Sequence, residues 1–185
     1  MRKNFGAKPW LYPMPVLMIG TYNADGTANI MNAAWGGISE ENEITICVDS
    51  SHKTAENLLQ RGAFTVSIGT ADMLESCDNV GITSGNQTPD KTARDGVHAV
   101  KSAFVVAPCF EELPMALECL VVSYDTESCR LVGEIVNVCA DECVLTEGKI
   151  DPKKLRPITY DPVNHDYLAL GEVAGKAFSD GKKLK

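Results

Sequence analysis

The chain has 185 residues, of which 23% are charged and 44% are hydrophobic, and its formal net charge is −8. This length fits one globular domain whose core needs no disulfide or metal to hold it together. The negative charge disfavours a general nucleic-acid-binding protein, which would carry a basic stripe. No apolar run reaches the length of a membrane span and no hydrophobic signal core follows Met1, so we expect a cytoplasmic protein without a membrane partner.

The first half of the chain predicts three strands, a short helix and a fourth strand. The strand candidates are the β-rich runs at residues 16–22, 27–35, 44–48 and 63–68. The first two are separated by Asn23-Ala-Asp-Gly26, and an Asp-Gly between two such runs is a hairpin signal. The helix is expected to begin at Lys53, directly after the third strand.

The second half predicts a long excursion and then further strands. Residues 71–98 open with a weakly amphipathic turn or helix and then become polar and rich in Gly, Asp and Thr, which favours a loop. The next runs alternate or stay apolar as barrel or sandwich strands do. They lie at residues 103–107, 116–124 and 131–138, with a turn at residues 125–128.

The last third changes character, with proline breaks followed by helical spacing at residues 167–178. We expect one domain over residues 1–185, in which residues 150–185 form a C-terminal segment that wraps the barrel or a partner subunit. The fold class expected from all these elements is mainly β with helices (α+β).

Seven cysteines are an odd number, and we interpret them as reduced thiols in a reducing compartment. Cys109, Cys119, Cys129 and Cys139 are ten residues apart, a spacing that raises the alternative of a metal or redox array. Zinc sites favour close ligand pairs such as C-x-x-C, whereas Cys139 and Cys143 form a C-x-x-x-C with no second pair or nearby histidine. Strand-core or surface cysteines are therefore favoured, and no metal site is expected.

The stretch from Asp49 to Thr54 predicts an anion site. A strand ends at Asp49, and Ser51, His52 and Thr54 lie at the mouth of the helix that Lys53 begins. Helix N-termini carry free backbone N–H groups and the positive end of the dipole, so hydroxyls and a lysine there suit a phosphate monoester. The alternative is that Ser51 or His52 simply caps the helix and Lys53 is solvated.

A second candidate site lies on the second strand, where Asn32-Ala-Ala-Trp35 places small side chains and backbone amides beside a large aromatic ring. Small side chains let a flat ligand approach the backbone. The alternative is a strand edge with a packed Trp35.

Both candidate sites lie on one strand-strand-strand-helix unit, and here the sequence resembles the flavin reductase-like family, in particular its flavoredoxin branch. The resemblance implies an FMN-binding split β-barrel. It includes Pro13-Met-Pro-Val-Leu-Met-Ile-Gly-Thr21 and Ser51-His-Lys-Thr-Ala-Glu-Asn57, and it extends in order over most of the chain. The further matching segments are residues 25–35, 62–67, 131–136 and 167–178.

The resemblance also implies the site. FMN would be the cofactor and would carry the redox chemistry itself, so no catalytic residue is assigned. The flavin ring and ribityl chain would face the second-strand residues, and the 5′-phosphate would lie at the helix mouth with one residue steadying the loop. The ring residues are Asn32, Ala33, Ala34 and Trp35, and the phosphate-end residues are Ser51, Lys53, Thr54 and, for the loop, Asn57.

The implied function is an FMN-binding oxidoreductase or a flavoredoxin-type electron-transfer protein, usually a homodimer with the flavin in a groove between subunits. Many NAD(P)H-dependent members carry a histidine shortly before the glycine that corresponds to Gly133, where this chain has Ser128-Cys129-Arg130. This departure favours electron-donor and acceptor proteins over NAD(P)H. Two alternatives stay open: an NAD(P)H-dependent flavin reductase that supplies free reduced flavin, and a non-catalytic flavin-binding module.

Overall fold

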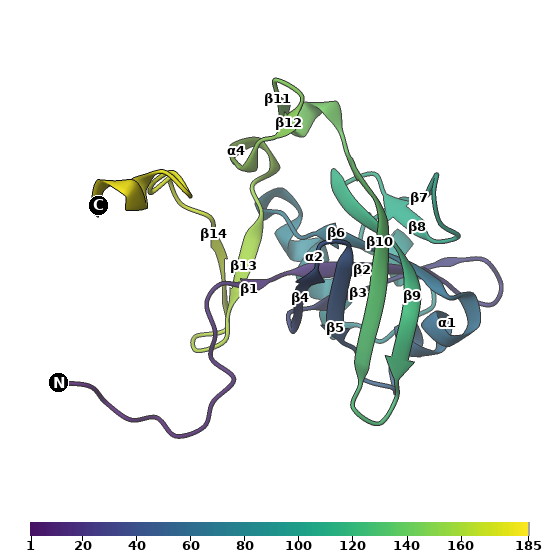
Figure 1. The fold of residues 1–185 in the computed structure, drawn as a ribbon. Helices are drawn as coiled ribbons and strands as arrows, with labels where there is room; N and C mark the ends of the chain where they lie inside the picture. Colours follow the sequence, from purple (N-terminus) through teal and green to yellow (C-terminus); the bar gives the residue numbers. More distant parts are fainter. Residues whose placement is uncertain (185) are drawn as a thin grey trace.

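A computed structural model describes residues 1–184, and its centre is one curled antiparallel sheet of seven strands (Figure 1). The strand order across the sheet is β3-β2-β6-β9-β10-β5-β4. The long hairpin of β9 and β10 extends beyond the other strands in the view of Figure 1. The strands are β2 (Leu17–Tyr22), β3 (Ala28–Ala33), β4 (Gly36–Glu40), β5 (Glu43–Cys47), β6 (Ala63–Ile68), β9 (Met115–Asp125) and β10 (Arg130–Ala140).

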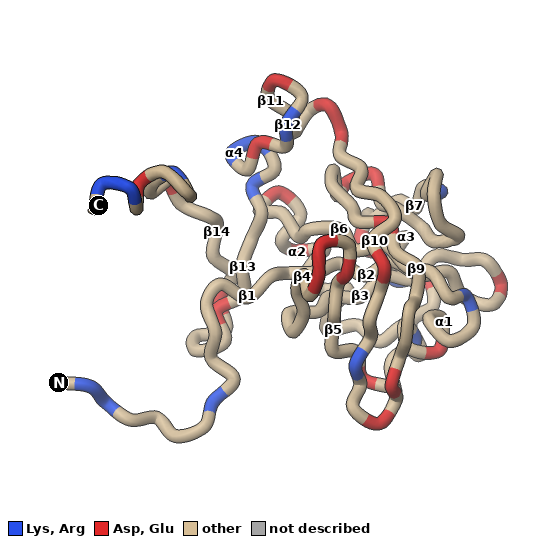
Figure 2. The backbone as a smooth tube through the Cα atoms, viewed as in Figure 1, with Lys and Arg blue, Asp and Glu red and all other residues tan. Residues whose placement is uncertain are grey.

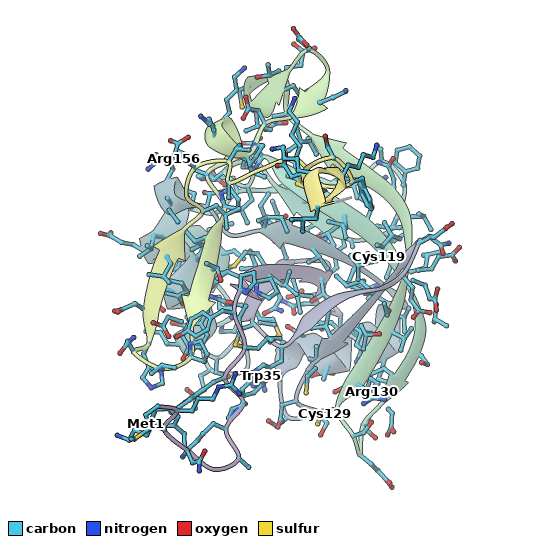
Figure 3. All side chains as sticks on the ribbon, turned by 60° about the vertical axis from the view of Figure 1, so that its left-hand side comes forward. Met1, Trp35, Cys119, Cys129, Arg130 and Arg156 are labelled. Atoms are coloured by element: carbon cyan, nitrogen blue, oxygen red, sulfur yellow. The ribbon has the colours of Figure 1, made fainter. Side chains whose placement is uncertain are left out.

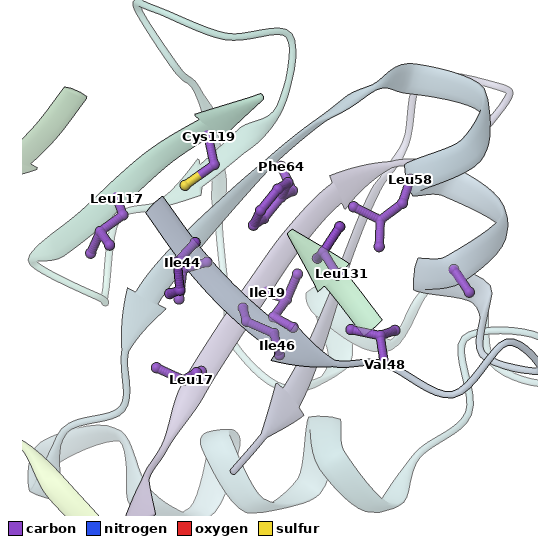
Figure 4. Packing of buried hydrophobic residues seen from close by; sticks show 12 residues of the cluster. Leu17, Ile19, Ile44, Ile46, Val48, Leu58, Phe64, Leu117, Cys119 and Leu131 are labelled. Atoms are coloured by element: carbon purple, nitrogen blue, oxygen red, sulfur yellow. The ribbon is translucent and has the colours of Figure 1, made fainter. Parts of the chain in front are cut away.

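The inner face of the sheet forms the main core (Figure 4). Side chains alternate along each strand, so every second residue of β2, β5, β6 and β9 enters the same cluster. Phe64 is its largest member and is fully buried. Gly133 lies against the Phe64 ring, and a Cβ at this position would stand only 2.3 Å from Phe64 Cζ. The close packing of β10 against the Phe64 ring therefore requires a glycine at this position.

Two helices flank β3 and thereby frame one edge of the sheet. Helix α1 (Lys53–Arg61) contacts β2 and β3 and ends at Gly62, which adopts the left-handed conformation that favours glycine. Helix α2 (Leu74–Ile82) contacts β3 and buries Cys77 and Val80 in a second apolar cluster with Val16, Met18 and Ile30.

The remaining elements are short. The two-stranded sheets are β7 (Ala99–Lys101) with β8 (Pro108–Phe110) and β11 (Leu145–Thr146) with β12 (Lys149–Ile150). The short helices are α3 (Lys91–Arg94), α4 (Pro152–Leu155), η1 (Ala71–Met73), η2 (Glu142–Val144) and η3 (Asp180–Leu184).

A separate three-stranded sheet joins the two ends of the chain in the order β1 (Met14–Pro15), β13 (Ile158–Asp161) and β14 (Asp166–Ala169). Beyond it both termini continue as arms that leave the barrel (Figure 1). Basic residues mark the ends of these arms, whereas acidic residues are spread over the barrel (Figure 2). Among the described residues no helix is long and apolar enough to cross a membrane.

The structure confirms the mainly β fold with helices and most of the expected strands. Both strands of the first hairpin, the helix at Lys53 and the strand at Ala63–Ile68 lie where the sequence predicts them. The prediction that residues 150–185 wrap the barrel or a partner stays a prediction.

Two sequence expectations are wrong, the strand at residues 103–107 and the helix at residues 167–178. Residues 103–107 form no strand, because Ser102 Oγ accepts hydrogen bonds from the N–H groups of Phe104 and Val105 and turns the chain. Residues 71–98 begin with η1 and α2, as the expected turn or helix, and their polar part contains only the short helix α3. Residues 167–178 are not helical, because β14 pairs with β13 over their first part.

Candidate functional site

A cavity of about 220 Å³ opens at the N-terminus of α1. Its walls come from three separate parts of the chain: β3, the start of α1, and the segment that follows α2. The polar lining residues are Asn29, Asn32, His52, Lys53, Thr54, Thr83, Ser84 and Lys91. Hydroxyls, two lysines and a helix N-terminus thus meet around a space of phosphate size.

The first turn of α1 keeps its backbone donors available. His52 occupies the N-cap position, but its side chain makes no capping hydrogen bond. Within residues 1–184, none of the hydrogen bonds uses the N–H groups of Lys53 or Thr54. Lys53 Nζ lies 2.9 Å from Glu56 Oε2 in a surface pair on the same helix. The capping alternative is therefore not observed, and the helix terminus favours an anion.

Thr54 holds the N-terminus of α1 against the sheet. Its side chain is 1% exposed, and Thr54 Oγ1 accepts a hydrogen bond of 2.9 Å from Asn29 Nδ2 on β3. Asn29 also reaches Thr21 Oγ1 at 3.4 Å. The position of the helix mouth is thereby set by buried polar contacts with the first hairpin.

Lys91 is a buried cation at the edge of the same cavity. Its side chain is 3% exposed, and Nζ donates to the carbonyl oxygens of Val80 (2.9 Å) and Thr83 (2.8 Å). Burial lowers the pKa of Lys91 to about 8, although the nearby Asp95 carboxylate acts to raise it. At pH 7 most Lys91 side chains therefore carry a positive charge.

A second cavity, of about 370 Å³, continues along β3 from the first. Both cavities are lined by Met31, Asn32 and His52, so together they form one groove. The second part is more apolar. Its further lining residues are Ala33, Ala34, Trp35, Cys47, Asp49, Cys129 and Tyr160.

The open end of the groove is marked by Trp35, whose side chain is 61% exposed. Trp35 lines one cavity with Cys129 and a neighbouring one with Arg130, and all three lie in the lower part of the view in Figure 3. Asn32 lies between the two halves, and its Nδ2 donates to the carbonyl oxygen of Cys77 on α2 at 3.1 Å. The groove thus has a polar, cationic end and an aromatic, solvent-facing end.

A protein-family model described as "Flavin reductase like domain" matches residues 10–162. The chain belongs to the flavin reductase-like family. No curated protein sequence matches it. The flavoredoxin of Desulfovibrio vulgaris (Miyazaki F) is 37% identical, with 98% of this chain and 100% of that chain covered and a TM-score of 0.92.

Two further solved structures are similar over most of the chain. The flavoredoxin of Methanosarcina acetivorans is 28% identical, covers 100% of both chains and has a TM-score of 0.89. An FMN-binding domain of a flavin reductases-like enzyme from Shewanella baltica is 22% identical, with 88% of each chain covered and a TM-score of 0.78. The predicted family, its flavoredoxin branch and the split-barrel fold are confirmed.

The groove along β3 contains most, but not all, of the site residues that were predicted from the sequence. Asn32, Ala33, Ala34 and Trp35 line its open half, and Lys53 and Thr54 line its polar half.

Ser51 and Asn57 lie outside the residues that line the two cavities. Ser51 Oγ donates to Asp49 Oδ1 at 2.6 Å, and the Ser51 N–H donates to the same oxygen. Asn57 is fully buried, and its Nδ2 donates to Thr21 Oγ1 and Asn23 Oδ1. Asn57 thus ties α1 to the first hairpin.

Sequence reasoning missed the lining residues from the segment after α2, above all Lys91 and Gly85. Both lie in a polar stretch that gave no periodic signal, and only the folded chain brings them to the helix mouth. It also missed Cys47, Cys129 and Tyr160, which come from three separate strands or turns. Because Cys129 lies in the turn between β9 and β10, this turn reaches the Trp35 end of the groove.

Proposed function

We propose that this protein binds FMN along the β3 groove, with the phosphate at the helix mouth and the ring beside Trp35. The observation that carries this proposal is the polarity of one continuous groove. Its polar half offers Lys53, Lys91 and the α1 N-terminus, and its more apolar half offers Ala33, Ala34 and Trp35. A phosphate dianion and a flat aromatic ring, joined by a polyol chain, match these two ends in order.

The family match and the similar flavoredoxin structures confirm the general prediction of a flavin redox function with FMN as the cofactor. When bound, FMN supplies the redox chemistry by accepting and releasing electrons with a proton. The chain binds and orients it. Lys53 and Lys91 neutralise the phosphate, and the amide groups of α1 donate to its oxygens.

We further propose that the electron donor and acceptor are proteins. The turn residues Ser128, Cys129 and Arg130 line the surface beside Trp35, and none of them is a histidine that could help to place a nicotinamide. A flavin ring at the solvent-exposed Trp35 end of the groove would be accessible to a docking protein without any rearrangement of the chain. The free cysteines fit action in the reducing cytoplasm.

We also propose that the protein acts as a homodimer. The described terminal arms carry apolar side chains that are largely solvent-exposed in one chain, among them Phe5, Leu11, Val173 and Phe178. Exposed apolar surface of this kind favours burial against a partner. The basic arms and the acidic barrel are complementary in charge, which suits contact between two copies (Figure 2).

A binding measurement tests the position of the phosphate. Lys53→Ala removes a side chain whose surface pair with Glu56 contributes little to stability. We expect the Kd for FMN to rise roughly 10- to 100-fold, because a hydrogen bond to a charged group contributes about 1.5–3 kcal/mol. The Kd for riboflavin, which lacks the phosphate, should stay unchanged.

Lys149→Ala, an exposed lysine on β12, is the matched control and should bind both flavins as the unaltered chain does. Equal losses for FMN and riboflavin in Lys53→Ala would contradict the assigned orientation. If none of the variants nor the unaltered protein retains FMN after desalting, flavin is at most a transient substrate.

An anaerobic reduction experiment separates the carrier from its alternatives. We expect slow reduction of the bound FMN by NADH and NADPH, and rapid reduction by a reduced ferredoxin or flavodoxin used as a protein donor. Rapid turnover with NAD(P)H and release of reduced flavin would instead identify a flavin reductase. Tight FMN retention without reduction by any donor would identify a non-catalytic binding module.

A further inference from the structure

Three potential metal ligands meet at a place that takes no part in the groove. The Sγ atoms of Cys109 and Cys139 and a carboxylate oxygen of Glu118 all lie within 4.8 Å of one another. They come from three different strands, β8, β10 and β9. All three line a cavity of about 360 Å³ that shares no residue with the flavin groove.

Strand register, and not the ten-residue spacing of the cysteines, brings these groups together. Asn137 lies opposite Glu118 and Cys139 lies opposite Ala116, so Glu118 and Cys139 project from the same face of the β9–β10 ladder. Cys119 points the other way, into the core (Figure 4). The neighbouring β7–β8 hairpin then places Cys109 beside them.

The carboxylate of Glu118 is held in place on both oxygens. Its side chain is 2% exposed, Oε1 accepts from Ser102 Oγ and from the Ala103 N–H, and Oε2 accepts from Asn137 Nδ2. Burial acts to raise the pKa of Glu118, but these hydrogen bonds outweigh it and lower the pKa below its usual value. The group is therefore an oriented, ionised carboxylate in a buried position.

No salt bridge within residues 1–184 involves Glu118. Its hydrogen-bond donors are a hydroxyl, a backbone amide and a side-chain amide, all of them neutral. A buried charge without a counter-charge is costly, and a cation between the three groups would provide one.

We propose that Cys109, Cys139 and Glu118 bind a thiophilic divalent cation of the zinc type. Thiolates and a carboxylate are zinc ligands, and atoms bound to one tetrahedral ion stand about 3.3–3.8 Å apart for bond lengths of about 2.0–2.3 Å. The observed separations permit this with small side-chain rotations. Ser102, Ala103 and Asn137 serve as the outer shell that orients the carboxylate. The cavity that these three residues line would leave room for water as a fourth ligand.

Binding requires that both thiols lose a proton, so that one Zn²⁺ and two Cys–SH groups give a Zn–dithiolate and two H⁺. Burial, together with the charges of Cys139 and Glu118, raises the pKa of Cys109 to about 12. Burial and the Glu118 charge also raise the pKa of Cys139. The other charged residues that line the cavity are Lys101, Glu111 and Asp141.

Because binding releases protons from the two thiols, the apparent Zn²⁺ affinity should rise with pH. Zinc titration of the FMN-loaded, thiol-reduced full chain against a chromophoric chelator tests this. We expect one Zn²⁺ and two released protons per chain, and protection of Cys109 and Cys139 from iodoacetamide in peptide mapping. This protection needs no variant.

Variants then assign the ligands. Cys109→Ser with Cys139→Ser should abolish Zn²⁺ binding, and Glu118→Gln should weaken it at least tenfold. Cys143→Ser removes an exposed cysteine that lines neither the groove nor this cavity, and it should leave Zn²⁺ binding unchanged. The proposal is overturned if the unaltered chain binds no Zn²⁺, if Zn²⁺ protects other cysteines instead, or if anaerobically purified protein contains a Cys109–Cys139 disulfide. None of these outcomes bears on FMN binding.

Discussion

Gly85 and Asn29 pack closely at the end of the groove where α1 begins. A Cβ at Gly85 would stand 2.5 Å from Asn29 Oδ1 and 3.2 Å from Lys53 Cβ. Asn29 cannot turn away freely, because its Nδ2 is bonded to buried Thr54. The loop that closes the cavity therefore approaches the helix mouth as closely as a glycine allows.

We expect Gly85→Ala to displace this loop and to raise the Kd for FMN by roughly tenfold, as overpacking typically costs about 1–3 kcal/mol. Fluorescence titration of the flavin measures the effect. Gly171→Ala is the control, because no heavy atom lies within 4 Å of the corresponding Cβ. An unchanged Kd in Gly85→Ala would show that the loop is not part of the binding site.

The residues of this end were only partly predictable. Lys53 and Thr54 could be found because a helix N-terminus is a local feature, written in consecutive residues. Lys91 could not, because its role depends on the carbonyl groups of Val80 and Thr83, which only the folded loop presents to it. Ser51 resembles a phosphate ligand in sequence, but its hydroxyl donates to Asp49.

Among the elements, the terminal sheet depends on one acidic residue of β13. Asp161 is nearly buried, and its carboxylate accepts hydrogen bonds from Tyr12, from Asn164 Nδ2 and from the Val163 N–H. Hydrogen bonds from Tyr12 and then Asn164 lower the pKa of Asp161 to about 2. The contact joins the N-terminal arm to a strand almost 150 residues later.

This low pKa predicts an acid-dependent loss of stability. A carboxyl whose pKa is lower in the folded chain stabilises the fold above its unfolded pKa, near 3.8, and the contribution disappears as the pH falls to about 2. We expect Asp161→Asn to lower the free energy of unfolding at pH 6 and to flatten its decline between pH 4 and pH 2.

Urea unfolding at a series of pH values measures this difference. Asp166→Asn, an exposed carboxyl on β14, is the control and should keep the pH dependence of the unaltered chain. Equal pH slopes for the unaltered chain and Asp161→Asn would contradict the assignment.

Helices and strands could be predicted where the local sequence pattern determines the secondary structure. The first hairpin and α1 follow from turn residues and period, whereas residues 103–107 mimic a strand through the alternation of exposed Phe104 and Val106 with buried Val105 and Ala107. Ser102 uses the amides that a ladder would need. Strand β4 was missed because its Gly36-Gly37 start lacks a β-rich signal.

At the scale of the whole molecule, the outer face of the β9–β10 hairpin is the surface that we expect a second copy to cover. Its apolar residues Leu120 and Val122 are both exposed in one chain. We expect Val122→Glu to shift the protein from dimer to monomer in light scattering and sedimentation, because a charge would have to be buried in the interface.

Leu59→Glu is the matched control, since Leu59 is an exposed apolar residue of α1 outside this surface. It should leave the dimer intact. A monomeric unaltered chain at micromolar concentration, or equal dissociation in both variants, would contradict the proposed interface.

The groove is polar and cationic at the N-terminus of α1 and solvent-exposed at Trp35, and this asymmetry has a kinetic consequence. A reaction that moves atoms needs its partner to enter the site, whereas an electron needs only a short separation at the surface. A fleeting encounter with the open end is then sufficient, and the lifetime of the complex can be brief. Since the chain carries a net charge of −8, we expect encounters with a basic redox partner to slow as ionic strength rises.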